Sequence, residues 1–119
     1  MKKNKTIGIV GSRRRNTEKD FELTKKEFLS VYNKGDKIVS GGCLKGGDAF
    51  AEIIAKEFGL TERNKKLIIY KAEWKKYGRA AGFIRNSDIA DEADVLIAVV
   101  HKDRKGGTED TIKKFLKKK

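Results

Sequence analysis

The sequence has no proline and very few of the residues that most often build metal or covalent sites. Its 119 residues include one cysteine, Cys43, and one histidine, His101. A single cysteine excludes an intrachain disulfide and a multi-cysteine metal site, and we expect neither a metal nor a cofactor. Cys43 and His101 lie far apart in the sequence, so we interpret Cys43 as a small packed residue rather than a nucleophile.

Long apolar runs, low-complexity linkers and internal repeats are also missing. No run reaches the length of a membrane span, and the apolar run at residues 7–10 is too short for a signal peptide. We therefore expect a cytoplasmic protein with no membrane partner, which agrees with its sparse cysteine. The length fits a single domain over residues 1–119.

Acidic residues are scarce relative to basic ones. Lys and Arg number 29 against 17 Asp and Glu, which gives a net charge of +12 and favours an anionic partner. Many of the lysines lie at the two ends of the chain, where they commonly serve solubility. Aromatic residues make up only 8% and do not alternate with those lysines as base-stacking platforms would. Nucleic acid therefore ranks below a small anionic molecule as the expected partner.

Short apolar runs alternate with segments of helical periodicity along the whole chain. The runs, which predict strands, cover residues 5–10, 37–40, 67–71 and 94–100. The predicted helices begin at Thr17, Asp48, Ala80 and Thr108. Their expected inward-facing residues are Phe21, Phe28, Leu29, Tyr32, Phe50, Ile53, Ile54, Phe58, Ala81, Ile84, Ile89, Ile112, Phe115 and Leu116. The alternation predicts a Rossmann-like three-layer α/β sandwich, with a mainly parallel sheet of four or five strands and helices on both faces.

Glycine-bearing turns follow three of the predicted strands: GSR at 11–13, SGGCLKGGD at 40–48 and GGT at 106–108. In a parallel sheet these turns meet at the carboxyl edge, where ligands bind. Backbone amides at a helix start favour anions, and the arginine of GSR offers a planar fork for phosphate. Asp48 has two interpretations, a helix cap or an acceptor for a ribose hydroxyl, and we slightly favour the cap.

The stretch at 72–86, AEWKKYGRAAGFIRN, gathers aromatic and cationic residues before and within the third helix. Trp74 and Tyr77 can stack on a base, or can pack between the loop and the sheet. Arg79 and Arg85 can bind phosphate, although Arg79 can also extend along the surface. Arg85 and Asn86 form a polar pair on an otherwise apolar helical segment, which favours a functional role for both.

Taken together, these motifs resemble the YspA-like branch of the SLOG superfamily. The matching features are GSR, SGGxxGGD, the 72–86 stretch, the aspartate that opens the fourth strand, and GGTxxTIKKF, which together cover nearly the whole chain. The resemblance implies a Rossmann-like domain that binds nucleotides or nucleotide-derived ligands. Relatives include the Lonely-guy phosphoribohydrolases, which cleave the base from a nucleoside monophosphate, and modules that sense ADP-ribose-like signals. Relatives also commonly form dimers, so the resemblance implies a homodimer.

Carried over by position, the resemblance implies a ribose and phosphate site built from the glycine turns. Its members are Gly11, Ser12, Arg13, Ser40, Gly41, Gly42, Gly46, Gly47, Asp48, Gly106, Gly107 and Thr108. Arg85 matches the arginine that Lonely-guy enzymes use in catalysis. The glutamate of their motif is replaced by Thr111, and the nearby Glu109 and Asp110 stand in a different register.

Three functions follow, in order of preference. The first is a protein that senses or sequesters a nucleotide or a nucleotide-derived ligand of the ADP-ribose kind. The second is an enzyme that cleaves an N-glycosidic bond with Arg85 and one of Glu109 or Asp110 as catalytic candidates. The third is a single-stranded nucleic-acid binder, which the positive charge and a distant kinship to a DNA-processing fold suggest.

Overall fold

The computed structural model describes residues 4–12, 14–43, 46–100 and 107–118, and its centre is one parallel sheet. The strands within these residues are β1 (Thr6–Gly11), β2 (Lys37–Ser40), β3 (Leu67–Ile69) and β4 (Val95–Val99). They lie side by side in the order β3-β2-β1-β4. Residue Ile7 pairs with Ile38 on one side and with Val95 on the other. The predicted parallel α/β fold is confirmed, and β2 has the predicted bounds.

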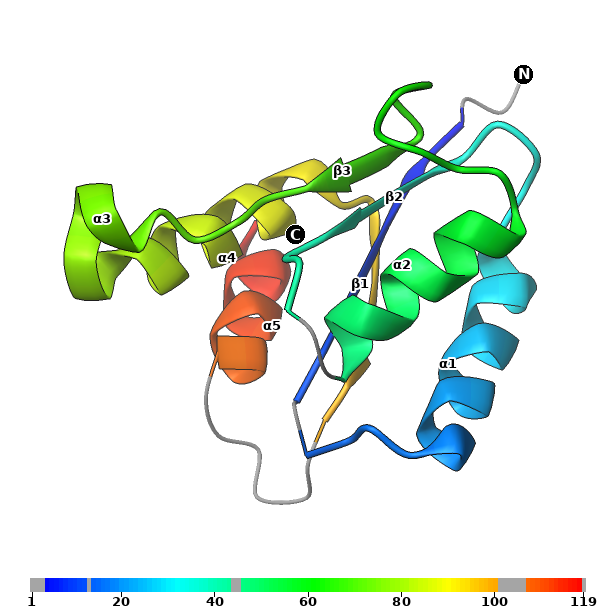
Figure 1. Cartoon of the computed structure of the whole chain (residues 1–119), viewed down its shortest axis with the longest axis horizontal. Coiled ribbons are helices and arrows are strands. Elements are labelled where there is room, and N and C mark those ends of the chain that lie inside the picture. The colour runs from blue at the N-terminus through cyan, green and yellow to red at the C-terminus, as the bar shows by residue number, and fades with distance from the viewer. Residues whose placement is uncertain (1–3, 13, 44–45, 101–106, 119) are drawn as a thin grey trace.

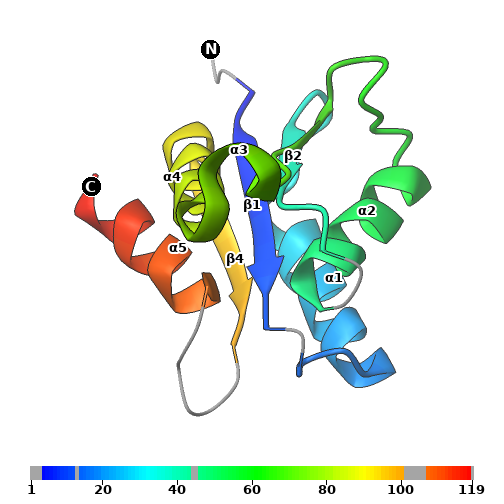
Figure 2. The same ribbon diagram turned by 60° about the vertical axis from the view of Figure 1, so that its left-hand side comes forward.

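Helices cover both faces of the sheet. They are α1 (Glu18–Val31), α2 (Gly47–Glu57), α3 (Trp74–Tyr77), the 3₁₀ turn η1 (Gly78–Ala80), α4 (Ala81–Glu92) and α5 (Gly107–Lys117). Figures 1 and 2 show α1 and α2 on one side of the strands and α4 and α5 on the other. Among the described residues, no helix has both the length and the apolar character that crossing a bilayer requires.

Alternation along the strands divides the core into two layers. Ile7, Ile9 and Ile38 face α1 and α2, where they pack with Phe28 and Ile54. Because successive strand residues point to opposite faces, the other layer takes the intervening positions. It joins Val10 and Val39 to Ile89, Ala93 and Phe115 on the side of α4 and α5.

The sequence predicted too many inward-facing residues on the helices. Four residues expected to face inward are instead among the exposed large hydrophobic residues: Leu29 (53%), Ile53 (50%), Leu116 (62%) and Ile84 (38%). The first three each adjoin an apolar neighbour on the same helix, namely Phe28, Ile54 and Phe115. Adjacent helical residues diverge by about 100°, so only one of each pair can point straight at the sheet.

The helix starts confirm one sequence signal and correct two others. At α1, Thr17 and Asp20 form a capping box, with Thr17 Oγ1 accepting from the Asp20 amide at 3.1 Å. At α2 the predicted cap is wrong, because Gly46 occupies the cap position and Asp48 makes no capping hydrogen bond. The helix α5 begins at Gly107, so Thr108 lies within its first turn rather than before it.

The segment before α4 departs from the predicted loop. Residues 74–80 form α3 and η1 ahead of α4, and neither has a buried residue. Figure 1 shows α3 projecting beyond the edge of the sheet. The sequence there has no apolar periodicity that could have predicted these turns, because nothing in them packs into the core.

Candidate functional site

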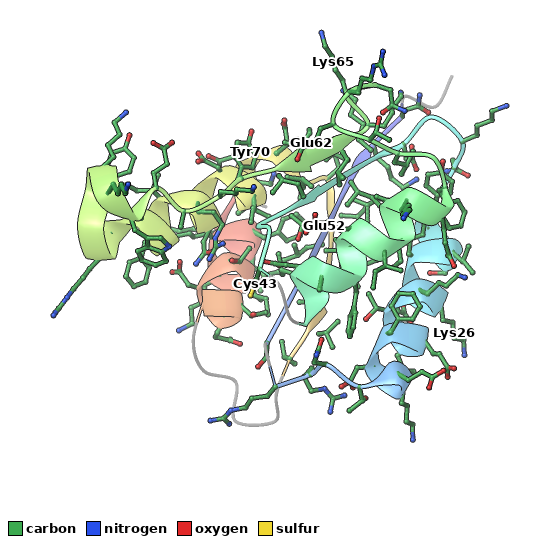
Figure 3. All side chains as sticks on the ribbon, viewed as in Figure 1. Lys26, Cys43, Glu52, Glu62, Lys65 and Tyr70 are labelled. Atoms are coloured by element: carbon green, nitrogen blue, oxygen red, sulfur yellow. The ribbon has the colours of Figure 1, made fainter. Side chains whose placement is uncertain are left out.

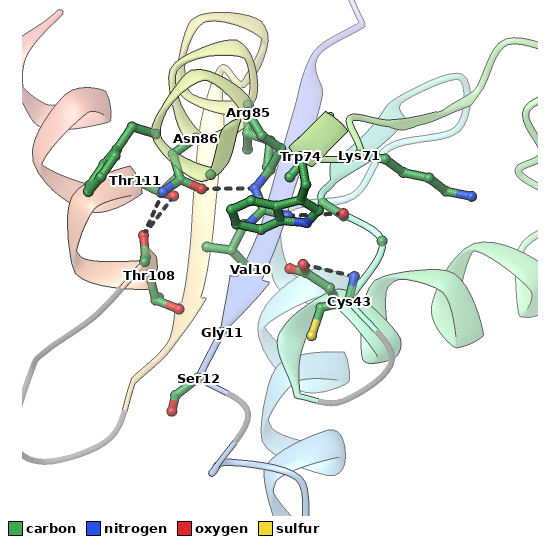
Figure 4. Close-up of a pocket in the computed structure, with 18 of the residues that line it drawn as sticks. Val10, Gly11, Ser12, Cys43, Lys71, Trp74, Arg85, Asn86, Thr108 and Thr111 are labelled. Atoms are coloured by element: carbon green, nitrogen blue, oxygen red, sulfur yellow. Dashed lines mark hydrogen bonds between the residues drawn. The ribbon is translucent and has the colours of Figure 1, made fainter. Parts of the chain in front are cut away.

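A cavity of about 940 Å³ lies at the carboxyl edge of the sheet. Segments that follow β1, β2 and β3 line it together with the start of α5, and α4 supplies one wall (Figure 4). Ligand pockets commonly have volumes of about 300–1,000 Å³, so a nucleotide-sized molecule fits. The position is the one at which parallel α/β sheets usually bind ligands.

The structure brings most of the predicted site residues to this cavity. Those that line it are Gly11, Ser12, Gly41, Gly42, Asp48, Trp74, Arg79, Arg85, Asn86, Gly107 and Thr108. Other predicted residues do not belong to the lining, namely Ser40, Gly46, Gly47, Tyr77, Glu109 and Asp110. Arg13 and Gly106 lie outside the described residues.

Two predicted glycines serve the framework rather than the cavity. A Cβ added at Gly47 would lie 2.2 Å from the carbonyl carbon of Val10, so the start of α2 packs directly on the end of β1. The amide of Gly46 donates to Asn16 Oδ1 at 2.8 Å. The close approach of α2 to β1 therefore explains Gly47, and the positive φ of 75° explains Gly46, without a ligand.

Asp48 is a buried carboxyl beneath the cavity. Its Oδ2 accepts from the Cys43 amide at 3.2 Å, and its Oδ1 lies 3.1 Å from Ser40 Oγ. Burial raises the pKa of Asp48, against the Cys43 amide, the charge of Arg85 and the Ser40 hydroxyl, which all act to lower it. The side chain is thus biased toward its neutral form relative to an exposed aspartate.

Ser40 supports Asp48 from below and has no surface for a ligand. It is fully buried, and its Oγ lies 2.5 Å from the Ile9 carbonyl oxygen as well as 3.1 Å from Asp48. A hydroxyl has a single hydrogen, which can serve only one of these two acceptors. A protonated Asp48 would satisfy both contacts, since it could donate to Ser40 Oγ while Ser40 donates to Ile9.

Arg85 extends from α4 to the turn that follows β2. Its Nη1 donates to the Gly41 carbonyl at 3.2 Å, and its Nε donates to Asn86 Oδ1 at 3.0 Å. Two of the five guanidinium N–H groups are therefore engaged. The other three have no acceptor among the described residues and lie at the cavity (Figure 4).

Asn86 is buried between α4 and α5. Its Nδ2 donates to the Gly107 carbonyl at 3.2 Å and to Asp110 Oδ2 at 3.0 Å. Asp110 also forms an ion pair with Lys114 at 2.8 Å, so its carboxylate is occupied outside the cavity. The same Gly107 carbonyl accepts a second hydrogen bond from Thr111 Oγ1 at 3.1 Å.

Trp74 and Tyr77 are not packed between the loop and the sheet. Trp74 is 58% exposed, and its indole lies across the mouth of the cavity in Figure 4. Tyr77 is 41% exposed, and Lys76 Nζ stands 5.1 Å from the centre of its ring. Of these two residues, only Trp74 lines the cavity and is placed to stack on a ligand there.

Among the lining residues that sequence reasoning overlooked are Arg14, Lys71, Cys43 and the exposed aromatic Phe83. Ser12 Oγ accepts from the Arg14 amide at 3.2 Å. Lys71 lies in the segment after β3, and in Figure 4 its side chain extends away from the other labelled lining residues. Arg14 follows the predicted strand at residues 5–10, and Lys71 is the last residue of the predicted strand at 67–71. A cation at the carboxyl end of a predicted strand is therefore the signal that could have found them. Cys43 was interpreted as packing alone, although its turn faces the cavity.

Positive charge dominates the lining. It includes four cationic residues, Arg14, Lys71, Arg79 and Arg85, whereas Asp48 is the one acidic residue among the described lining residues. By contrast, Lys26 and Lys65 point outward from the molecule in Figure 3. No group of three His, Cys, Asp or Glu side chains in the described part of the chain could hold a metal ion.

Comparison with family models, curated proteins and solved structures found no match to this chain. The geometry and chemistry of the cavity therefore carry the functional argument.

Proposed function

We propose that the protein binds a nucleotide or nucleotide-derived anion, a ribose phosphate of the ADP-ribose kind, in the cavity at the carboxyl edge. It would act as a cytoplasmic sensor or sequestering protein. One observation carries the proposal, namely that four cationic residues surround a nucleotide-sized cavity whose one described acidic lining residue is a buried carboxyl with a raised pKa. Such a cavity favours an anionic ligand.

The remaining parts of the cavity support the same ligand class. Ser12 and Thr108 add hydroxyl groups to the lining. First-turn amides of a helix have no partner within the helix, so the start of α5 can donate to phosphate. Trp74 offers an exposed aromatic face, on which a base can stack. The resemblance to SLOG proteins agrees with this assignment.

We favour binding over cleavage of a glycosidic bond. Cleavage needs a group that stabilises positive charge on the ribose or activates water. Glu109 and Asp110 are not part of the described lining, and Asp110 is held by Asn86 and Lys114. Thr111 occupies the position of the relatives' glutamate, and its hydroxyl donates to Gly107. We therefore expect no release of free base from AMP, and measurable release would favour the enzyme.

The experiment that tests the proposal is isothermal titration calorimetry with ADP-ribose, ADP and AMP. Arg85→Ala should weaken binding by about tenfold to 100-fold, because it removes a charge-assisted contact. Arg63→Ala is the matched control, since it removes the same charge from an exposed residue before β3, at the opposite edge of the sheet. Absence of heat at millimolar ligand, or equal losses in both variants, would contradict the proposal.

Nucleic-acid binding remains the third function. Two of the C-terminal lysines are engaged within the protein, because Lys114 Nζ donates to the Phe83 carbonyl at 2.8 Å and Lys118 Nζ to the carbonyls of Asp91 and Ala93 at 2.9 and 2.7 Å. Lys114 thus contacts the first turn of α4, and Lys118 contacts its C-terminal end. Steeply salt-dependent binding of single-stranded DNA would favour this alternative.

A homodimer is proposed from the resemblance alone. The mass in solution, measured by size-exclusion chromatography with light scattering, tests it, and a monomeric mass at micromolar concentration would reject it.

A further inference from the structure

We propose that Asn86 is a positioning residue, which holds the guanidinium of Arg85 and the start of α5 at a fixed separation so that both contact the same anion. The role of the anion rests on the proposed function, whereas the positioning itself can be tested without a ligand. Asn86 would thus act through its neighbours, rather than by binding the ligand as the sequence suggested.

The amide nitrogen of Asn86 is already engaged within the protein. The residue is 4% exposed, and both of its ends make hydrogen bonds to other parts of the site. Oδ1 accepts from Arg85 Nε, while Nδ2 donates to the Gly107 carbonyl and to Asp110 Oδ2. An amide nitrogen has two hydrogens, so none is left for a ligand.

Asn86 restricts the side chain of Arg85. A long side chain loses rotamer freedom when it binds, and that loss weakens binding unless the side chain is ordered beforehand. Asn86 holds Nε and the Gly41 carbonyl holds Nη1, so the guanidinium is fixed at two points. Arg85 is therefore already ordered in the conformation that presents its remaining N–H groups to the cavity.

Asn86 also holds the first turn of α5. The Gly107 carbonyl belongs to the first residue of this helix and accepts from both Asn86 Nδ2 and Thr111 Oγ1. Asp110, in the same first turn, accepts from Asn86 as well. Asn86 thus fixes the helix start at two points and ties it to Arg85 on α4. A ligand that bridges the two elements would meet both in fixed positions.

The hydrogen bonds at position 86 require an amide side chain. Its three partners are one donor, the Arg85 Nε–H, and two acceptors, the Gly107 carbonyl and the Asp110 carboxylate. An aspartate would keep the first contact but would bring its second oxygen against the two acceptors. A leucine of similar size would make none of the three contacts. The two substitutions therefore separate the Arg85 contact from the α5 contact.

The test uses NMR of the ¹⁵N-labelled full chain with inorganic pyrophosphate as the anion. In the wild type we expect a resolved, slowly exchanging Arg85 Nε–H signal, whereas the exposed Arg79 serves as a fast-exchanging internal reference. Asn86→Leu should abolish the slow exchange, and Asn86→Asp should retain it. Pyrophosphate affinity should fall by roughly tenfold or more in both variants, because a contact to a charged group is lost or α5 is displaced.

Two controls separate positioning from loss of fold. Asn64→Leu removes a similar set of contacts, with the Thr61 and Lys66 amides and the Gly59 carbonyl, from the opposite edge of the sheet. It should leave the Arg85 signal and the pyrophosphate affinity unchanged. In the double variant Asn86→Asp, Asp110→Asn, residue 110 can donate a hydrogen bond to residue 86. The pyrophosphate affinity should therefore recover in part.

The outcomes distinguish this inference from the proposed function. An unchanged Arg85 Nε–H signal in Asn86→Leu, or equal pyrophosphate affinity in wild type and Asn86→Leu, would overturn the role of Asn86. If the wild type does not bind pyrophosphate at all, the proposed anion site fails. The Nε–H signal then decides alone whether Asn86 positions Arg85.

Discussion

The two edges of the sheet each hold a buried aspartate, and the two are treated oppositely. At the amino edge, Asp36 accepts from the Lys5 amide at 2.9 Å, from Lys5 Nζ at 2.6 Å and from the Asn33 amide at 2.8 Å. At the carboxyl edge, Asp48 has the Cys43 amide and the Ser40 hydroxyl, and Arg85 contributes charge without a hydrogen bond to it. The first carboxylate is paired with its own cation, whereas the second lines a cavity rich in cations.

The pKa directions follow from this difference. Burial acts to raise the pKa of Asp36, but the hydrogen bonds from Lys5 and Asn33 and the charge of Lys5 together outweigh it, so the pKa is lowered. Burial raises the pKa of Asp48, and its partners do not compensate. The amino edge therefore has the properties of a closed structural network. The carboxyl edge leaves positive charge for a molecule that the chain itself does not supply.

The largest effect we expect comes from Gly47→Ala, which tests whether the carboxyl edge is rigid beneath its open surface. The new Cβ would lie 2.2 Å from the Val10 carbonyl carbon, where only the backbone could move. We expect a loss of about 3 kcal/mol in the free energy of unfolding, measured by urea denaturation. Gly82→Ala is the matched control, because its Cβ meets only Trp74, at 3.4 Å. It should gain about 0.5–1 kcal/mol, as alanine usually does within a helix.

Asp36→Ala, the next in size, tests the closed network at the amino edge. Lys5 and Asp36 have side chains 23% and 1% exposed, so their pair is partly shielded from water. We expect a loss of about 2 kcal/mol in stability and no change in ligand affinity. Glu57→Ala breaks an exposed ion pair between Lys25 and Glu57, whose side chains are 35% and 43% exposed, respectively. It should lower the free energy of unfolding by less than about 1 kcal/mol. Equal losses in the two variants would remove the distinction between the edges.

Much of the fold could be predicted because its signals are local. The apolar runs that form the strands end at glycines or charges, and Thr17 with Asp20 marks the start of α1. The exposure of Leu29 and Leu116 could not be predicted, because periodicity does not say which of two adjacent apolar residues faces the sheet. Packing against a neighbouring element decides which residue faces the sheet, and the local sequence does not show that packing.

The candidate site divides in the same way. The glycine turns could be placed at one edge because they follow strands that run parallel, and Arg85 stood out as an arginine on an apolar helix. The burial of Ser40 and the failure of Asp48 to cap α2 could not be predicted, since both depend on how closely α2 approaches β1. The engagement of Asn86 likewise depends on where α5 meets α4.

Gly41→Ala and Gly59→Ala sharpen the comparison by placing the same substitution at opposite edges. A Cβ at Gly41 would lie 2.7 Å from Asp48 Oδ2 and 2.8 Å from Arg85 Nη1, so it should displace Arg85. We expect roughly tenfold weaker ADP-ribose binding, the size of one lost contact to a charged group. A Cβ at Gly59 would meet nothing within 4 Å, but φ there is +70°. Gly59→Ala should cost about 1 kcal/mol in stability and leave affinity unchanged.

The smallest change we expect in the fold comes from Asp48→Asn, which replaces the carboxyl by an amide of the same shape. In the wild type the pKa of Asp48 is raised above 3.8, so between pH 3.8 and that higher pKa the native state binds more protons than the unfolded state. The stabilisation that protonated Asp48 gives to the native state is complete below pH 3.8 and is lost as the pH rises through the native pKa. Asp36 acts in the other pH range, because its lowered pKa gives stability above pH 3.8 that is lost as the pH falls through its native value.

Melting temperatures of Asp48→Asn across pH 3 to 8 should therefore lack the decline above pH 3.8 and keep the acid-side loss due to Asp36. A decline of unchanged size in Asp48→Asn would show that Asp48 does not titrate as a buried carboxyl, and the contrast between the two edges would then fail.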